Sequence, residues 1–196
     1  GRELELRTRL GLKGRFVVGY VGTHGLAHAL DTILDSAKIV LQSPAGEDVH
    51  FIFLGEGSEK VRLQQRRDSE KLSNVTFLEP VSKEEVVRYW GLLDVSVVHL
   101  KNIPLFETVI PSKLFECMAM GVPILHGVRG ESANIVIDND VGITFEPENA
   151  EELGASILRL KQDSVVLERM GKNGIASAKL FDRRHLAKKM LSDVKK

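Results

Sequence analysis

The sequence predicts a single doubly wound, Rossmann-like α/β domain with a mainly parallel sheet and further helices at its C-terminal end. Continuous apolar runs at residues 16–21 and 49–54 are typical of strands that helices cover on both faces. Segments with helical spacing alternate with such runs, and glycine-containing turns follow the first two. This alternation favours right-handed crossovers, which place strand carboxyl ends and helix N-termini at one edge of the sheet.

The first half of the chain is expected to alternate regularly between helices and strands. A charged segment at its start has helical spacing and is ended by Gly14. Apolar positions then recur at helical spacing between Leu30 and Val40. Ser82 and Glu85 form a capping box that begins a later helix. The predicted order is helix 1–12, strand 16–21, helix 30–40 closed by residues 43–46, strand 49–54, helix 58–72, strand 75–78, helix 82–91 and strand 94–100.

The second half continues the same pattern and ends in helices. Pro111 disfavours helical angles in the residue before it, so a helix is expected to open near Ser112. Gly121 suits a left-handed cap at the end of that helix. Asn149 and Glu152 form a second capping box. The remaining predicted elements are loop 101–110, strand 122–125, helix 132–137, strand 142–145, and helical segments from residue 149 onward with a break near residue 163.

The composition is that of an ordinary globular domain without a charge field that would attract nucleic acid. The chain has 196 residues, of which 43% are hydrophobic and 28% charged, and its formal net charge is zero. The single cysteine, Cys117, excludes an internal disulfide and fits a reducing cytoplasm. No signal peptide or bilayer-spanning apolar run is evident. The chain opens without a methionine, which suggests a piece of a longer protein. The basic residues of the tail are expected to form a solvated helix face: Arg183, Arg184, Lys188, Lys189, Lys195 and Lys196.

The helix expected to open near Ser112 carries the most informative residue, Glu116. Its neighbours are largely apolar, so the sequence predicts a buried carboxylate. A buried carboxylate is costly unless something donates hydrogen bonds to it, and ribose hydroxyls are suitable donors. The unpaired amides at the helix start would suit a pyrophosphate. Lys113 either pairs with that diphosphate or is a solvated first-turn lysine. The segment therefore predicts a nucleotide-sugar site.

Two glycine turns are expected at the same edge of the sheet. The first contains Gly22, Thr23, His24 and Gly25, and the second contains Gly55, Gly57 and Lys60. Either turn would let backbone amides approach a ligand phosphate, or would be a plain tight turn. His24 is the better histidine candidate for a hydrogen bond to a phosphate or sugar. The spacing departs from the dinucleotide fingerprint, and no phosphate-loop motif occurs, so NAD binding and phosphate-loop chemistry are disfavoured.

No metal or nucleophile site is indicated. The six histidines lack metal-ligand spacing; His24 and His28 are four residues apart but have no evident third ligand. No Ser-His-Asp or Cys-His arrangement stands out. The sequence predicts no bound cofactor.

A family resemblance is carried by residues 19–25, 51–57, 74–81 and 111–123, and by 139–147 followed by 150–153. Taken together, these segments resemble the C-terminal, donor-binding domain of a GT-B fold glycosyltransferase, similar to family 4 of the retaining enzymes. The resemblance covers nearly the whole chain. Residues 74–81 and 111–123 are fairly specific, whereas the glycine turns alone are not.

The resemblance implies a role for each matched residue. Glu116 would hold the donor ribose, and the backbone from Ser112 through Lys113 to Leu114 would receive the pyrophosphate. Phe77 and Leu78 would line the base pocket through backbone contacts. The two glycine turns would approach the phosphates through Gly22, Thr23, His24, Gly25, Gly55, Gly57 and Lys60.

The chain departs from the family pattern in two places. The family pairs two glutamates with seven residues between them, and that count from Glu116 gives Thr108, whereas Glu107 stands one residue further away. Either Glu107 or Thr108 is therefore the candidate at the catalytic position that contacts the donor sugar. The family also often has an Arg and a Lys after the first glycine turn, where this chain has His24 and His28. Lys113 and these histidines are the candidate replacements.

The resemblance also implies what lies outside this chain. Residues 1–196 would be the donor-binding domain, and the N-terminal acceptor domain would be absent. The expected substrate is a nucleotide-diphosphate sugar linked to UDP, bound without a metal, and the expected acceptor is a carbohydrate or a lipid-linked molecule. The full-length protein is expected in the cytoplasm, where it could associate with the inner face of the membrane, and no nucleic-acid binding is expected. Two alternatives stay open: a non-catalytic nucleotide-binding or scaffold module, and a fragment of a sugar-nucleotide epimerase.

Overall fold

The computed structural model describes residues 2–181 and confirms the predicted fold class. Within this range six parallel strands form one sheet in the order β3-β2-β1-β4-β5-β6. The order reverses between β1 and β4, which is the switch point at which open α/β sheets bind ligands. The strands are β1 (Phe16–Val21), β2 (Val49–Leu54), β3 (Val75–Leu78), β4 (Val95–His99), β5 (Ile124–Gly127) and β6 (Gly142–Thr144).

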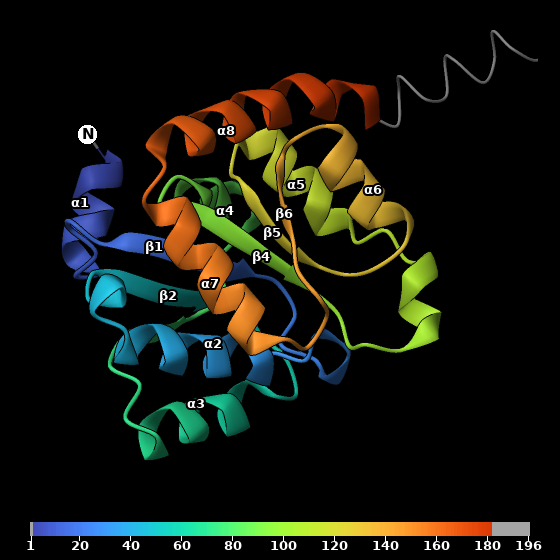
Figure 1. The fold of residues 1–196 in the computed structure, drawn as a ribbon. Coiled ribbons are helices and arrows are strands. Elements are labelled where there is room, and N and C mark those ends of the chain that lie inside the picture. The colour runs from blue at the N-terminus through green and yellow to red at the C-terminus, as the bar shows by residue number, and fades with distance from the viewer. Residues whose placement is uncertain (1, 182–196) are drawn as a thin grey trace, which may run out of the picture.

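Helices cover both faces of the sheet (Figure 1). On one face α2 and α7 lie side by side, whereas α4 and α5 lie behind the other. The α-helices are α1 (Arg2–Arg9), α2 (Asp31–Gln42), α3 (Lys60–Ser69), α4 (Lys83–Trp90), α5 (Ser112–Met120), α6 (Glu131–Asp138), α7 (Ala150–Lys161) and α8 (Ser164–Ala178). Short 3-10 turns are η1 (Leu26–His28), η2 (Pro44–Gly46), η3 (Pro104–Thr108) and η4 (Lys179–Phe181).

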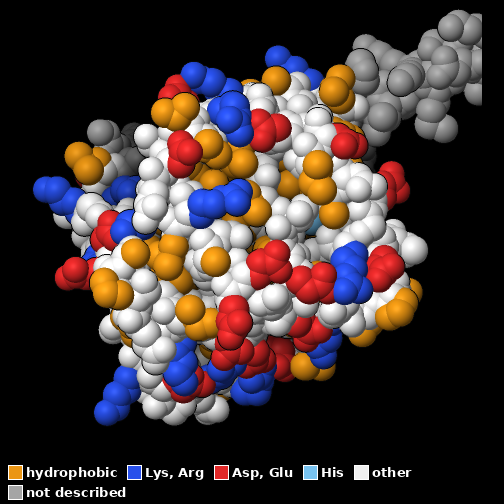
Figure 2. All heavy atoms as spheres, viewed as in Figure 1, with side chains coloured by type: hydrophobic (Ala, Val, Ile, Leu, Met, Phe, Trp, Pro, Cys, Tyr) orange, Lys and Arg blue, Asp and Glu red, His pale blue; other side chains and the backbone are white. Residues whose placement is uncertain are grey.

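Strand alternation divides the core into two apolar clusters. In β1, Val18 and Tyr20 pack on the side of α2 and α7, whereas Val17 and Val21 pack on the side of α4 and α5. All six β1 residues are buried, as the continuous apolar run predicted. Over the outer surface of α2 and α3, acidic and basic side chains meet in a network (Figure 2). Arg66 there contacts Asp31, Asp35 and Glu70 and ties the two helices together.

The helix ends follow the sequence signals with one partial exception. The Ser82–Glu85 capping box is complete, and Gly121 ends α5 at φ 66° in the left-handed region. The Asn149 side chain accepts from the Glu152 amide as predicted. The Glu152 carboxylate, however, accepts from the Glu146 amide at 2.9 Å, so the second capping box is only half formed.

Strand β5 does not lie at the predicted residues 122–125. The Val122 amide donates to the Cys117 carbonyl and so completes the end of α5. Pro123 has no N–H to contribute to the sheet. The strand therefore begins at Ile124 and extends to Gly127. The basic tail predicted for residues 183–196 lies outside the described residues.

Two glycines of α8 let this helix pack closely on α5. A Cβ at Gly171 would lie 2.6 Å from the Gly121 carbonyl oxygen, and one at Gly174 would lie 3.1 Å from that of Met118. Larger residues would push the helices apart. The packing of α8 therefore sets the position of α5, whose N-terminus reaches the carboxyl edge of the sheet.

Candidate functional site at the carboxyl edge of the sheet

The loops that follow β1 and β2 meet at the carboxyl edge of the sheet. The Gly22 amide donates to the Leu54 carbonyl, and the His24 amide donates to that of Glu56. In return the Glu59 amide donates to the His24 carbonyl. The two predicted glycine turns therefore form one unit.

The glycines of the second turn are required by this loop–loop contact. Gly55 and Gly57 have φ angles of 148° and 159°. A Cβ at Gly55 would overlap the Gly22 carbonyl oxygen, and one at Gly57 would overlap the backbone of His24. Both positions thus have a structural reason to be glycine, whatever they contribute to a ligand.

Lys113 reaches across from α5 to the first turn. Its ammonium lies where a Cβ of Gly22 would be, and it stands 5.7 Å from the centroid of the Tyr20 ring. The side chain is half-buried and, within the described residues, forms no ion pair. Burial lowers the pKa of Lys113, while the nearby Glu116 charge opposes that shift. A desolvated cation without a counter-ion is a favourable partner for an incoming anion.

Within residues 2–181, backbone amides without acceptors occur on both segments that meet at Lys113. Among the described residues, the amides of Ser112 and Lys113 at the start of α5 have no acceptor, and neither do those of Thr23 and Gly25. The predicted Leu114 contact is weaker, because its side chain is fully buried and its amide donates to the Pro111 carbonyl. The edge thus offers four free N–H groups beside one ammonium, a suitable arrangement for a diphosphate.

The Glu116 carboxylate is exposed, whereas the sequence predicted a buried one. The side chain is exposed and, within the described part of the chain, makes no hydrogen bond or ion pair. It projects from the solvent side of α5, while Leu114, Cys117 and Met118 form the buried side. The cost of burying a carboxylate is therefore no reason to expect a ligand at Glu116. The carboxylate is nevertheless free to accept hydrogen bonds from a ligand hydroxyl.

His24 also lies differently from the expectation. Its ring is fully buried, its centroid 5.8 Å from that of Tyr20 and 5.9 Å from that of Phe77. Neither ring nitrogen has a hydrogen-bond partner within residues 2–181. The ring therefore faces the core, and this placement does not support the predicted hydrogen bond from its side chain to a phosphate or sugar. The turn can offer backbone amides only.

Lys60 is similarly withdrawn from the edge. The side chain is 5% exposed, and its ammonium lies 2.8 Å from the Glu56 carboxylate and 3.2 Å from that of Glu79. It also donates to the Leu78 carbonyl at 3.4 Å. The Lys60 charge is therefore already paired, which does not support a direct contact between its ammonium and a phosphate. Instead Lys60 holds the end of β3 against the second turn.

The candidate base pocket lies at that end of β3. Phe77 stacks on Phe53 with a centroid distance of 4.7 Å and lies beneath the Arg67 guanidinium. Leu78 is partly buried and packs against the opposite apolar cluster. Both side chains are thus engaged in the core, so at this end of β3 only backbone contacts would be open to a ligand.

Glu107 and Thr108 both lie on η3, between β4 and α5. The Thr108 hydroxyl donates to the Leu105 carbonyl at 3.0 Å. The Glu107 carboxylate lies 3.6 Å from the Arg129 guanidinium, and a Cβ at Gly130 would overlap the Glu107 carbonyl. Neither side chain forms a hydrogen bond or an ion pair with Lys113 or Glu116. The structure thus places both candidates on an exposed turn in the loop that precedes α5.

The contacts that join η3 to the β6–α7 loop were not predicted from the sequence. Arg129 pairs with Glu146 as well as with Glu107. Asn102 donates through its side chain to Glu146 and through its amide to Glu148. No spacing in the sequence links these residues, because they come from three separate loops.

Two buried histidines should make the protein unstable in acid. Burial lowers the pKa of His24 and of His126 from 6.5 to about 4. In the unfolded chain both would titrate near 6.5, so their contribution to stability is present above that pH and is lost as pH falls toward 4. We expect the unfolding free energy to fall by about 1.4 kcal/mol per pH unit for each group in this window. Urea unfolding at pH 7, 6 and 5 measures this slope.

The variant His24→Leu keeps the apolar contacts and removes one of the two titrating groups. We expect the slope of the unfolding free energy against pH to decrease by about 1.4 kcal/mol per pH unit, which corresponds to the uptake of one proton. An unchanged slope in this variant would mean that the folded His24 ring takes up protons as readily as the unfolded one.

Two general properties complete the description of residues 2–181. No helix in this range combines the length and the apolar character needed to cross a bilayer. Nor do three or more histidine, cysteine, aspartate or glutamate side chains cluster there in a way that could hold a metal ion.

The chain resembles known glycosyltransferases in sequence. The family model described as glycosyl transferases group 1 matches residues 3–177. The alpha-D-kanosaminyltransferase of Streptomyces kanamyceticus is 25% identical over 173 residues, which cover 88% of this chain but 43% of that protein. The chain thus spans less than half the length of that relative.

Solved structures show the same fold. The structure of Alr3699/HepE from Anabaena, in complex with UDP and glucose, has a TM-score of 0.77 at 20% sequence identity. The match covers 97% of this chain and 52% of the HepE chain. The C-terminal domain of LpcC, a glycosyl transferase group 1 protein from Francisella tularensis, has a TM-score of 0.72 at 17% identity, with 90% of each chain covered. With its family-model match and its six-stranded Rossmann-like sheet, this chain belongs to the group 1 glycosyltransferases of the GT-B superfamily.

Proposed function

We propose that this chain is the donor-binding half of a retaining glycosyltransferase and binds a nucleotide-diphosphate sugar. One observation carries the proposal: the Lys113 ammonium, which has no ion-pair partner within residues 2–181, lies against Gly22, and both segments that meet there carry amides without an acceptor in that range. The four free amides and the ammonium would bind the diphosphate. During transfer they would stabilise the charge that develops on the departing diphosphate, an electrostatic role that needs no metal.

The neighbouring groups would hold the rest of the donor. The exposed Glu116 carboxylate would accept hydrogen bonds from the ribose hydroxyls. The backbone after Phe77 and Leu78 would contact the base, with Lys60 and its acidic partners keeping that backbone in place. Glu107 or Thr108 on η3 would contact the sugar. UDP is the proposed nucleotide, and the UDP-bound HepE structure, which shares this fold, supports that choice.

The acceptor would be a carbohydrate or lipid-linked molecule held by a part of the protein outside this chain. The relatives support this, because the chain covers 43% of the kanosaminyltransferase and 52% of HepE. We therefore expect the 196-residue chain alone to bind donor without transferring sugar. The full-length enzyme is proposed to work in the cytoplasm, at the inner face of the membrane where its acceptor is lipid-linked.

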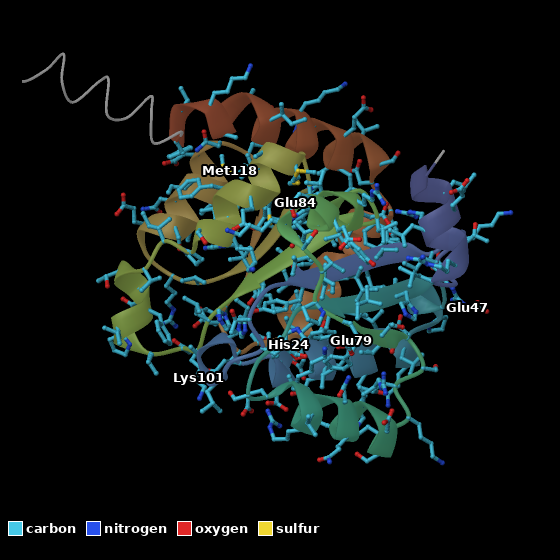
Figure 3. The ribbon with its side chains drawn as sticks, turned by 180° about the vertical axis from the view of Figure 1, so that it is seen from behind. His24, Glu47, Glu79, Glu84, Lys101 and Met118 are labelled. Carbon is cyan, nitrogen blue, oxygen red and sulfur yellow. The ribbon has the colours of Figure 1, made fainter. Side chains whose placement is uncertain are left out.

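Ligand-dependent thermal stability tests the proposal. We expect millimolar UDP or UDP-sugar, but not NAD, to raise the melting temperature by several degrees, since ligand at a hundred times its dissociation constant contributes about 2.7 kcal/mol. Glu116→Ala should remove most of this shift. Glu84→Ala, on the exposed first turn of α4, is the matched control and should retain it (Figure 3). A shift with NAD, or a full UDP shift in Glu116→Ala, would contradict the assignment.

A further inference from the structure

His99 ends β4 and is hydrogen-bonded through both ring nitrogens to loops that come from other parts of the chain. Its Nδ1 lies 2.8 Å from the His28 carbonyl oxygen, and its Nε2 accepts from the Glu148 amide at 2.9 Å. The side chain is 2% exposed and stacks on Phe145 with an interplanar angle of 15°. The ring therefore has one orientation, set by three contacts.

These partners also determine the protonation state of the ring. A carbonyl oxygen can only accept, so Nδ1 must carry the proton that it donates to His28. A backbone amide can only donate, so Nε2 must be unprotonated. His99 is thus neutral and in the Nδ1–H tautomer. A second proton on Nε2 would point at the Glu148 N–H.

The two loops that His99 joins lie at the carboxyl edge. His28 ends η1, three residues after the free Gly25 amide, and Glu148 stands between β6 and α7. Further backbone contacts continue the connection, because the Lys101 amide donates to the Ala27 carbonyl and the Asn102 amide donates to the Glu148 carboxylate. A pocket of about 120 Å³ lies there, with Gly25, Ala29, Lys101 and Glu148 in its wall. Figure 3 shows Lys101 and His24 toward this end of the sheet and Glu47 at the opposite end.

We propose that His99 is a positioning residue for donor binding: as the neutral Nδ1–H tautomer it clamps the β1–α2 and β6–α7 loops to the end of β4. This inference rests on the proposed function, because it assigns to His99 the task of holding the Thr23 and Gly25 amides in the register that a diphosphate needs. No atom of His99 reaches the solvent-facing edge, so it acts through the backbone of His28.

The clamp should open in acid. Burial lowers the pKa of His99, and the charge of the His28 side chain lowers it further. The hydrogen bond to the His28 backbone carbonyl and the negative charge of Glu148 both oppose this shift. His126, on the neighbouring strand, is another titratable group that interacts with the ring. Protonation would remove the acceptor for the Glu148 amide and release one of the two loops.

The first measurement is the ¹⁵N spectrum of the histidine rings at pH 7, together with hydrogen exchange of the Glu148 and Lys101 amides. We expect a neutral Nδ1–H ring for His99, and slow exchange at both amides. In His99→Phe, which keeps a ring to stack on Phe145, both amides should exchange faster. A Nε2–H or charged ring at pH 7, or unchanged exchange in His99→Phe, would overturn the clamp.

The second measurement is the UDP dissociation constant by calorimetry, at a temperature where every variant is folded. We expect His99→Phe to weaken UDP binding about tenfold, the equivalent of roughly 1.4 kcal/mol, through loss of the hydrogen bonds that fix the loops. In His99→Gln the side-chain carbonyl oxygen can take the place of Nε2 as the acceptor for the Glu148 amide, so this variant should recover part of the affinity. Because glutamine does not titrate, the variant should lack the loss of affinity that the wild-type protein shows in acid. The matched control is His126→Gln, because His126 is buried on the next strand and its side chain hydrogen-bonds only to Ser132 among residues 2–181.

Failure of this inference is distinguishable from failure of the proposed function. Wild-type protein that binds no UDP overturns the proposed function, and the amide exchange then still decides whether His99 holds the loops. Wild-type affinity in His99→Phe, with UDP binding otherwise intact, overturns the positioning role alone.

Discussion

Gly55→Ala is expected to destabilise the protein by at least about 3 kcal/mol. The new Cβ would overlap the Gly22 carbonyl oxygen, and both partners are backbone, so neither can rotate away. Overpacking of this kind costs about 1–3 kcal/mol, and a non-glycine residue at φ 148° adds further strain. For a chain of this size the melting temperature should fall by roughly 6–12 °C.

Gly14→Ala is the control for the conformational part of this effect. Gly14 has φ 71°, but a Cβ there would have no atom within 4 Å. Its substitution should therefore cost only about 1 kcal/mol. Calorimetric melting of both variants measures the difference. Equal losses in the two proteins would show that the contact between the β1–α2 and β2–α3 loops does not constrain Gly55.

Lys113→Met is expected to weaken UDP binding about 10- to 100-fold without lowering stability. A charge-assisted hydrogen bond to the diphosphate contributes about 1.5–3 kcal/mol, and methionine cannot replace it. The same ammonium is half-buried without an acidic partner among the described residues, so the folded protein gains little from its charge. Methionine keeps an apolar stem of similar length beside Tyr20.

The measurement combines calorimetric titration with UDP and thermal melting of the ligand-free protein. Lys13→Met is the control, since Lys13 is an exposed lysine just before β1, at the opposite end of that strand from Gly22. A lower melting temperature together with unchanged UDP affinity in Lys113→Met would mean that the lysine has a structural role instead.

The local structure was predictable because it depends on interactions close in sequence. The buried β1 run, the Ser82–Glu85 capping box and the left-handed Gly121 cap all involve residues within one or two turns of each other. The parallel sheet followed from the alternation of helices and strands. The start of β5 was misplaced because the end of α5 and a proline compete for the same residues.

The side-chain environments at the site were less predictable. His24 and Lys60 both follow strands that end at the carboxyl edge. The His24 ring, however, is buried in an aromatic cluster, and the Lys60 charge is paired with Glu56 and Glu79. Glu116 has apolar neighbours in sequence, but these occupy the other sides of α5. Hydrophobic composition alone does not say which side of a short helix faces solvent.

By itself, the sequence determined the α/β class and the order of the elements, because periodicity, caps and strand direction are encoded locally. Only the tertiary structure decided which charges are free. Among the described residues Lys113 has no ion-pair partner while Lys60 is paired, and Arg129 and His99 join loops that are distant in the chain. The physical reason is that charge pairing and burial depend on distances in space, and these are set when helices and loops pack on the sheet.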